Sequence, residues 1–308
     1  MYIVYNMNVD KMSRPDWVDS NIYPFESKWM TLEGHGIHYV DEGPKNAPVL
    51  LFVHPAAGWS FTYRYHIRKL SKDFRCVAPD LPGYGLSLAS DKYKYSLLEQ
   101  SHVLEQFVKI LDLRDIVVWA NDGGGPTAVL ALANQSDRVL GLVVGGTFGW
   151  SLKDYPEVSR MLRFASGPVF RIMNRYTNIF SRIMGTKALG TRKLSKTEQL
   201  HYSLPFKKRN TRNYPLILIG SFLDPEVQRK LDLSIPSFRD KAVLIQFGTK
   251  DRMTRQKWPE RWVKEVPNNR VHMLTGVDHF PFEDVPETTV QNFQVWWTDL
   301  KTRNHAIP

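Results

Sequence analysis

The chain has 308 residues, of which 43% are hydrophobic and 12% aromatic, and its formal net charge at neutral pH is +10. This length and composition support a large buried core and exclude a disordered tail or a disulfide-stapled miniprotein. Sixteen basic and six acidic residues fall between positions 151 and 236, so one central block accounts for the whole excess of positive charge. That asymmetry excludes a uniformly basic, histone-like protein.

Cysteine, histidine and hydropathy patterns give no sign of export, metal binding or membrane insertion. The single cysteine, Cys76, lies in an apolar run and has no partner for a disulfide or a zinc cluster. No stretch approaches the roughly 18 apolar residues of a transmembrane segment, and the N-terminal residues do not resemble a secretory signal. His35 and His38 lie three residues apart, but no Asp, Glu or Cys completes a ligand set. We therefore expect a cytoplasmic protein without a metal or other cofactor.

In chain order, short apolar runs first form a hairpin and then alternate with helical patterns. The continuous apolar run at residues 49–53 is typical of a strand buried on both faces of a parallel sheet. This alternation predicts an α/β sheet with right-handed crossovers. The first six predicted strands are residues 28–32, 37–40, 49–53, 75–79, 116–120 and 139–144, with helices at 97–111 and 126–133.

The alternation stops between residues 151 and 236, which contain helical patches but no clear buried strand. These patches are residues 158–164, 197–202 and 225–231. Strands resume at 242–247 and 271–274, with helices near 259–266 and 285–300. We predict a core domain of residues 1–150 and 237–308, with residues 151–236 inserted after the sixth strand as a helical cap, or lid.

The loop after the strand at 116–120 carries a carboxylate in an unusual setting. Asp122 is flanked by Ala120, Gly124 and Gly125, and the context runs from strand to turn to helix. A nucleophile elbow needs such small neighbours because its backbone is strained and crowded. An aspartate that merely caps the following helix would not require them. We therefore predict that Asp122 is a nucleophile.

Two further polar residues follow Asp122 at the ends of later strands. Asp251 lies just after the strand at 242–247, and His279 lies in the loop after the last strand. The order nucleophile, acid, histidine along the chain is the one that an α/β-hydrolase site requires. We predict that Asp122, Asp251 and His279 form a catalytic triad.

With these residues in place, the sequence resembles the α/β-hydrolase superfamily and, within it, the haloalkane dehalogenase branch. The resemblance covers nearly the whole chain and implies a mostly parallel, eight-stranded sheet flanked by helices, with a helical cap. The segments that carry it are residues 23–43, residues 78–87 (Ala-Pro-Asp-Leu-Pro-Gly-Tyr-Gly-Leu-Ser), cap residues 194–206 and residues 279–287 (His-Phe-Pro-Phe-Glu-Asp-Val-Pro-Glu).

The resemblance also implies a mechanism for a small apolar organic substrate and water. Asp122 attacks an electrophilic carbon and forms an alkyl ester, because a carboxylate is already anionic near neutral pH. His279, oriented by Asp251, then activates the water that hydrolyses the ester. The amides of Ala56 and Gly123 form the oxyanion hole, where loss of one donor typically costs about 3 kcal/mol.

The sequence departs from the branch at the positions that usually hold the departing halide. Gly123 and Ala56 stand where these enzymes carry a Trp and, commonly, an Asn, and neither residue offers a side-chain donor. Trp59 or Trp150 would have to supply an indole N–H instead. Trp119 is a poorer candidate, because a strand residue just below the elbow belongs to the core.

Three alternatives therefore stay open. An epoxide hydrolase uses the same aspartate chemistry with a cap acid, commonly tyrosine, and a β-lactone decarboxylase resembles the same branch. A non-catalytic ligand receptor or pseudoenzyme on this scaffold is the alternative from another class. The cap tyrosines that are candidates for the pocket are Tyr155, Tyr176, Tyr202 and Tyr214.

The basic block has two interpretations. It forms the solvated outer face of the cap, or it attracts anionic substrates or an anionic membrane surface as a peripheral contact. We favour the solvated face. Nucleic acid is not an expected partner because no binding motif accompanies the charge. The sequence makes no prediction of oligomeric state.

Overall fold

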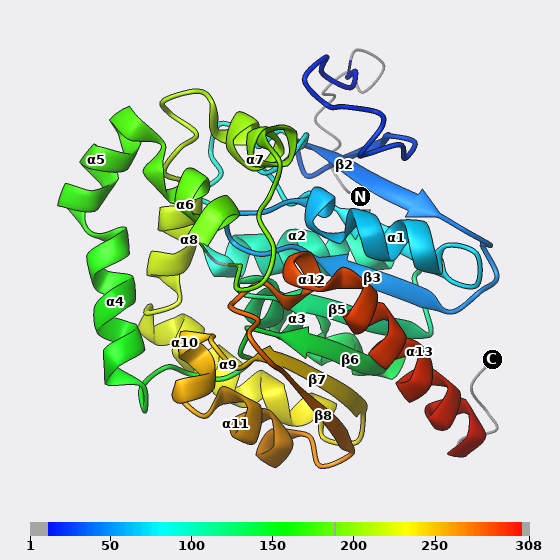
Figure 1. The fold of residues 1–308 in the computed structure, drawn as a ribbon. Coiled ribbons are helices and arrows are strands. Elements are labelled where there is room, and N and C mark those ends of the chain that lie inside the picture. The colour runs from blue at the N-terminus through cyan, green and yellow to red at the C-terminus, as the bar shows by residue number, and fades with distance from the viewer. Residues whose placement is uncertain (1–11, 188, 304–308) are drawn as a thin grey trace.

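A twisted eight-stranded sheet runs through the centre of the molecule in the computed structural model, which describes residues 12–187 and 189–303 (Figure 1). The strand order is β1-β2-β4-β3-β5-β6-β7-β8. Strand β2 pairs antiparallel with β1 and β4, and the other neighbours are parallel, as predicted. The strands are β1 (Lys28–Leu32), β2 (His35–Glu42), β3 (Val49–Val53), β4 (Arg75–Pro79), β5 (Ile116–Asn121), β6 (Val139–Gly145), β7 (Ala242–Gly248) and β8 (Asn269–Leu274).

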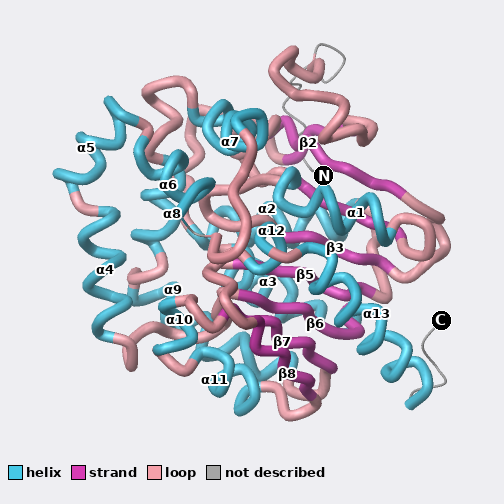
Figure 2. The backbone as a smooth tube through the Cα atoms, viewed as in Figure 1, coloured by secondary structure: helices cyan, strands magenta, loops and turns pink. Residues whose placement is uncertain are grey.

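Helices cover both faces of this sheet (Figure 2). Strand β3 is apolar throughout because Leu50 and Phe52 belong to one buried cluster, whereas Leu51 and Val53 belong to the other. The first cluster includes α1 and α13 residues, and the second includes α2 and α3 residues. The helices of the sheet domain are α1 (Arg64–Leu70), α2 (Leu97–Ile110), α3 (Gly124–Leu132), α10 (Arg252–Arg255), α11 (Trp258–Glu265), α12 (Pro281–Asp284) and α13 (Pro286–Arg303).

A group of helices lies between β6 and β7, so the predicted insertion after the sixth strand is confirmed. The three predicted helical patches fall within α4, α7 and α9, whereas the sequence analysis did not predict α5, α6 and α8. Helix α8 is buried through Leu216, Leu218 and Ile219 and packs against α4. The inserted helices are α4 (Pro156–Ser166), α5 (Pro168–Thr177), α6 (Ile179–Lys187), α7 (Lys196–Ser203), α8 (Tyr214–Ser221) and α9 (Pro225–Ser234).

The parallel strands direct their carboxyl ends, and the loops that follow them, to one edge of the sheet. The loops after β3, β5, β7 and β8 carry Ala56, Asp122, Asp251 and His279 in turn. This edge of an open α/β sheet is where ligands bind. None of the described helices is long and apolar enough to cross a membrane.

Candidate active site

Asp122 occupies a strained turn between β5 and α3. Its φ of 49° lies in the left-handed region, which a residue other than glycine rarely adopts. A Cβ atom on Gly124 would come within 2.2 Å of the Val53 carbonyl oxygen, and one on Gly125 within 2.0 Å of the Thr147 Oγ1. The small residues that flank Asp122 in the sequence are therefore required by close packing under the turn. The geometry is that of the strand–turn–helix elbow predicted from the sequence.

Asp251, His279 and Asp122, from the ends of three strands, lie side by side in that order, and we call them the row. His279 Nδ1 lies 3.1 Å from Asp251 Oδ1, and His279 Nε2 lies 3.4 Å from Asp122 Oδ1. Asp251 also accepts a hydrogen bond from the Met253 amide, which fixes the carboxylate at the start of α10. Asp251 is buried, whereas the side chains of Asp122 and His279 are 18% and 19% exposed, so a water-sized molecule reaches the reacting end of the row.

The two carboxylates control the protonation of His279. Burial lowers the imidazole pKa, but the charges and hydrogen bonds of Asp251 and Asp122 outweigh it, and the pKa lies well above the ordinary value. The two acidic neighbours therefore favour the protonated form of His279. Neutralising either carboxylate would lower the pKa of His279 and free the imidazole to act as a base.

The Asp122 carboxylate is oriented by the loop after β3. The Ala56 amide donates a hydrogen bond of 2.8 Å to Oδ2, which leaves Oδ1 facing His279. Gly123 follows at the start of α3, but among the described residues no hydrogen bond joins its amide to this carboxylate. Of the two predicted oxyanion donors, the structure thus brings Ala56 into contact with Asp122.

Two residues that the sequence analysis missed hold the backbone around the row. Thr147 Oγ1 donates to the Asp122 carbonyl oxygen at 2.5 Å. The Asn121 amide group donates to the carbonyl oxygens of Gly145 and His279, at 2.5 and 3.1 Å. Asn121 therefore ties the elbow to the histidine loop. A signal existed for Asn121, since a polar residue ends an otherwise apolar strand directly before Asp122.

The tryptophans proposed as halide donors are placed differently from one another. Trp59 Nε1 donates to the His201 carbonyl oxygen at 2.8 Å, so its N–H is already used. Trp150 is fully buried against Trp258 and Trp262, and its nitrogen has no hydrogen-bond partner within the described part of the chain. Trp119 lies in the core, as predicted, where it packs on aromatic residues from both chain halves.

The space beside Gly123 is apolar. A Cβ atom there would lie 3.1 Å from the Ala56 Cβ and 3.3 Å from the Phe222 ring. Phe222 follows α8 of the insertion and is buried. The side chains that border this position are thus hydrocarbon, and the one polar atom among its three nearest neighbours is the Ala56 amide nitrogen at 3.3 Å, which donates to Asp122.

The four cap tyrosines have different surroundings. Tyr155 is half-buried near Trp258, whereas Tyr176 is 62% exposed and its ring faces the Arg209 guanidinium. Tyr202 donates to Glu283 Oε2 at 2.5 Å. Tyr214 stacks on Tyr95 with ring centroids 3.6 Å apart, and both line a groove of about 740 Å³. Tyr176 therefore lies on the outside of the insertion, and Tyr202 is engaged in a buried ionic network.

Tyr84 is a further tyrosine that the sequence analysis did not consider for the site. It is fully buried between His54 and Phe206, and its hydroxyl has no hydrogen-bond partner among the described residues. Burial first, and the charge of Asp122 second, raise its pKa well above the ordinary value. The hydroxyl therefore stays protonated and remains available as a donor within the electrostatic reach of Asp122.

A buried ionic network joins the insertion to α12, the short helix that follows His279. Arg64 pairs with Glu283 at 2.6 Å and with Glu198 of α7 at 2.6 Å, and all three side chains are buried. Arg192 also pairs with both glutamates. Two arginines thus face two glutamates, which balances the charge.

Asp284, the last residue of α12, makes a second connection to the insertion. Asp284 accepts hydrogen bonds from the backbone amides of Gly190, Thr191 and Arg192, at 2.6, 2.9 and 2.9 Å. The Thr191 hydroxyl adds a bond of 2.7 Å. The segment before α7 is therefore held directly on the loop that carries His279.

His38, which raised the question of a metal, is buried within a hydrogen-bond network. Its Nδ1 lies 2.9 Å from Asp80 Oδ2 and its Nε2 lies 3.1 Å from Ser27 Oγ. Asp80 also accepts from the amides of Ser60 and Leu86. Both ring nitrogens of His38 are thus engaged: Nδ1 connects β2 to the loop after β4, and Nε2 connects it to Ser27, directly before β1.

Comparison with known proteins defines the class that this fold and site indicate. Residues 48–286 match the family described as alpha/beta hydrolase fold. Haloalkane dehalogenase 2 of Mycobacterium tuberculosis is 30% identical over 285 residues, which cover 87% of this chain and 94% of that protein. The chain belongs to the α/β-hydrolase family and is an enzyme of that family.

Further relatives locate it within the family. A cis-3-alkyl-4-alkyloxetan-2-one decarboxylase of Shewanella oneidensis is 25% identical over 291 residues, 91% of each chain. The crystal structure of haloalkane dehalogenase DbeA from Bradyrhizobium elkani superposes with a TM-score of 0.83 at 22% identity, covering 91% of this chain and 100% of that one. The protein belongs to the haloalkane dehalogenase-like branch of the α/β-hydrolases.

Proposed function

We propose that this enzyme hydrolyses a small apolar electrophile through a covalent ester on Asp122. The observation that carries the proposal is the conformation of Asp122: a positive φ at a strand–helix turn, one carboxylate oxygen on the Ala56 amide and the other facing His279. A residue in a strained conformation persists only where its surroundings enforce it, and such residues cluster at active sites.

The reaction proceeds in two displacements. Asp122 Oδ1 attacks the substrate carbon, a C–O bond forms, and the leaving group departs with the bonding electron pair. The ester no longer carries the Asp122 charge, so one cause of the raised His279 pKa disappears. The imidazolium therefore releases its proton to solvent, and the neutral imidazole then takes a proton from water, whose oxygen attacks the ester carbonyl carbon. Collapse of the tetrahedral intermediate releases the alcohol and restores Asp122.

The apolar space beside Gly123 bears on the leaving group. Phe222 and Ala56 border it, and the Trp59 N–H is engaged by the His201 carbonyl oxygen. A halide at this position would lack the side-chain donors that the branch normally provides. We therefore propose that the substrates include electrophiles whose leaving oxygen stays attached to the carbon skeleton, namely epoxides and β-lactones, besides haloalkanes.

Isotope labelling tests the covalent step. After single turnover of a haloalkane, epoxide or β-lactone in ¹⁸O water, mass spectrometry of the Asp122 peptide should show incorporation of the label. His279→Phe serves as the matched control, because it permits the first displacement but not the second and should accumulate the alkylated peptide. Verified turnover with an unlabelled Asp122 peptide would refute the ester mechanism.

One observation favours epoxide opening as the second candidate function. The alkoxide that forms when an epoxide opens needs a proton donor, and the buried Tyr84 hydroxyl, which has no hydrogen-bond partner among the described residues, is a candidate for that donor. Tyr84→Phe removes one oxygen from a buried site and should lower epoxide turnover by about 10²-fold or more. Turnover of a haloalkane, which needs no such proton, is the internal control. An equal loss with both substrates would reject this role for Tyr84.

We also propose that residues 151–236 act as the cap and residues 1–150 and 237–308 as the core domain. The connections of the insertion to Glu283 and Asp284 support a cap seated over the histidine loop. The expected cytoplasmic location and independence of a cofactor stay predictions.

A further inference from the structure

Helix α5 carries an apolar stripe that points away from the protein. Val169, Ile172, Met173 and Tyr176 recur at the spacing of one helical face. Their exposed fractions are 79%, 62%, 40% and 62%. Phe164, at the end of α4, is 72% exposed and its ring lies next to Phe170 of α5. We call Phe164, Val169, Ile172, Met173 and Tyr176 the outer stripe.

The opposite side of α5 holds the helix in this orientation through the polar contacts of Asn174 and through Phe170, which packs on the hydrophobic core. Asn174 is fully buried, and its side-chain nitrogen donates to the Arg212 carbonyl oxygen at 2.7 Å and to Asn213 Oδ1 at 3.2 Å. Its side-chain oxygen accepts from the Phe180 amide at 2.9 Å. Helix α5 thus faces the protein with Asn174 and Phe170 and leaves a second apolar face, the outer stripe, exposed.

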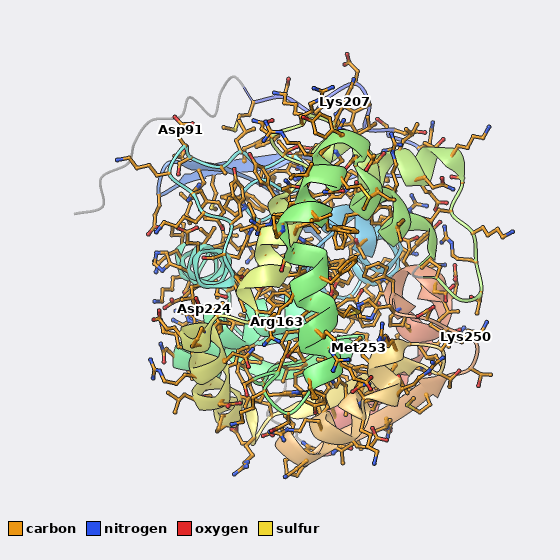
Figure 3. The ribbon with its side chains drawn as sticks, turned by 90° about the vertical axis from the view of Figure 1, so that its left-hand side faces the viewer. Asp91, Arg163, Lys207, Asp224, Lys250 and Met253 are labelled. Carbon is orange, nitrogen blue, oxygen red and sulfur yellow. The ribbon has the colours of Figure 1, made fainter. Side chains whose placement is uncertain are left out.

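Basic residues outnumber acidic ones in the helices that carry the outer stripe, where Glu157 lies in the first turn of α4. Between Glu157 and Glu198 the sequence contains nine basic residues and no acidic residue. Figure 3 looks onto α4 and α5, with Arg163 on this face and Lys207 above it, whereas Asp91 and Asp224 lie to one side. The Arg209 guanidinium lies 5.3 Å from the Tyr176 ring centroid. The exposed basic residues are Arg160 and Arg163 of α4, Arg175 of α5 and Arg182 of α6.

We propose that the outer stripe docks on the surface of an anionic phospholipid bilayer. A helix with apolar residues on one face and cations beside them lies in the interface, with the apolar side chains among the upper acyl chains and the cations at the phosphates. The inference goes beyond the proposed function, because it concerns a surface on the outside of the insertion. It does not depend on how Asp122 reacts.

The charge distribution disfavours the two protein partners that would compete with a membrane. A second copy of this chain would bring two strongly basic faces together around the stripe, and like charges repel. An acidic protein surface would match the charge but would place carboxylates against five exposed apolar side chains. A bilayer satisfies both features, since its phosphates meet the arginines and its acyl chains meet the stripe.

Vesicle binding tests the proposal with the full chain. Vesicles with about 30% phosphatidylglycerol in phosphatidylcholine should bind the protein at least about tenfold more tightly than pure phosphatidylcholine, and raised salt should weaken this binding. The double variant Val169→Asp with Ile172→Asp should bind at least about tenfold more weakly. Val295→Asp is the matched control, since Val295 is 57% exposed on α13, a helix of the sheet domain, and it should bind like the parent protein.

A fluorescent label distinguishes contact with the bilayer from a change in folding. Cys76 is fully buried, so Met173→Cys and Val295→Cys each offer one accessible thiol to a polarity-sensitive dye. On anionic vesicles the dye at position 173 should shift to the blue and the dye at position 295 should not. The absence of binding, equal binding to both vesicle types, or equal loss in the Val295→Asp variant would overturn the proposal. So would a dimer in solution that Ile172→Asp dissociates.

Discussion

The buried network at Glu283 allows a stability effect to be worked out in advance. Glu283 receives two hydrogen bonds from Arg64, at 2.6 and 2.8 Å, and one from the Tyr202 hydroxyl at 2.5 Å. Arg64 and Glu283 are each 1% exposed, so water does not replace a lost partner. Glu283→Gln keeps the size of the side chain and one acceptor oxygen but removes the charge that balances Arg64.

The expected loss of stability is large. In the parent protein burial opposes the charge of Arg64, but the Glu283 carboxylate outweighs burial and raises the pKa of Arg64. The variant lacks that carboxylate, yet Arg64 stays charged because a guanidinium keeps its proton in proteins. Removing one partner of a buried ion pair costs about 3–5 kcal/mol. Because Glu198 still contacts Arg64 at 2.6 Å, we expect the lower end, about 3 kcal/mol. For a chain of this length the melting temperature should fall by about 6 °C.

Urea unfolding followed by tryptophan fluorescence and circular dichroism measures this loss. The matched control is the double variant Glu283→Gln with Arg64→Met, which removes both charges and leaves Arg192 paired with Glu198. It should be about 1–2 kcal/mol more stable than Glu283→Gln alone, because no uncompensated charge stays buried. A single variant within about 1 kcal/mol of the parent protein, or a double variant less stable than the single one, would refute the electrostatic reasoning.

Three further outcomes are expected. Burial raises the pKa of Glu198, but the hydrogen bond and charge of Arg192, with other partners, outweigh burial and lower this pKa from 4.5 to about 2. The ionised Glu198 therefore stabilises the fold fully above pH 4.5, and this stabilisation is lost as the pH falls toward about 2. Acid unfolding of the parent protein and of Glu198→Gln, compared over this pH range, measures the loss. Gly125→Ala should destabilise the protein by about 1–3 kcal/mol, because the new methyl group would lie 2.0 Å from Thr147 Oγ1. The same clash should shift the turn that carries Asp122 and lower turnover by about 10²-fold, and normal turnover in this variant would contradict the expectation. Gly123→Trp should be accommodated only together with Phe222→Ala, since the Phe222 ring lies 3.3 Å from the new Cβ. The double variant should then bind halide, measured by quenching of tryptophan fluorescence, and halide binding by the single variant would contradict the packing argument.

The triad could be predicted because its signals are local in the sequence. Gly124 and Gly125 mark the elbow for a reason visible in the structure, since any side chain there would meet the Val53 carbonyl or Thr147. Asp251 and His279 were found by their places after strands, and parallel strands bring such places to one edge of the sheet. Local chemistry and sheet topology thus suffice for these residues.

The surroundings of the triad could not be predicted because they depend on contacts between distant segments. The engagement of the Trp59 N–H by the His201 carbonyl oxygen joins residues 142 positions apart. The apolar stripe of α5 indicates a helix but not the direction in which it faces, and the polar contacts of Asn174 decide that direction. Tyr176 was expected in the pocket for its residue type, whereas the rotation of α5 places it outside.

The contacts of Glu283 and Asp284 with the insertion have a consequence for substrate entry and product release. These residues follow His279 by four and five positions, and they hold Arg64, Gly190, Thr191 and Arg192. If the insertion moved away as a rigid unit, it would break these bonds and disturb the segment that carries His279, the general base in the proposed mechanism. We therefore expect substrate entry to leave the contacts of residues 190–192 with Glu283 and Asp284 intact, so that the side chains lining the entrance, rather than a hinge at this point, decide which molecules reach Asp122.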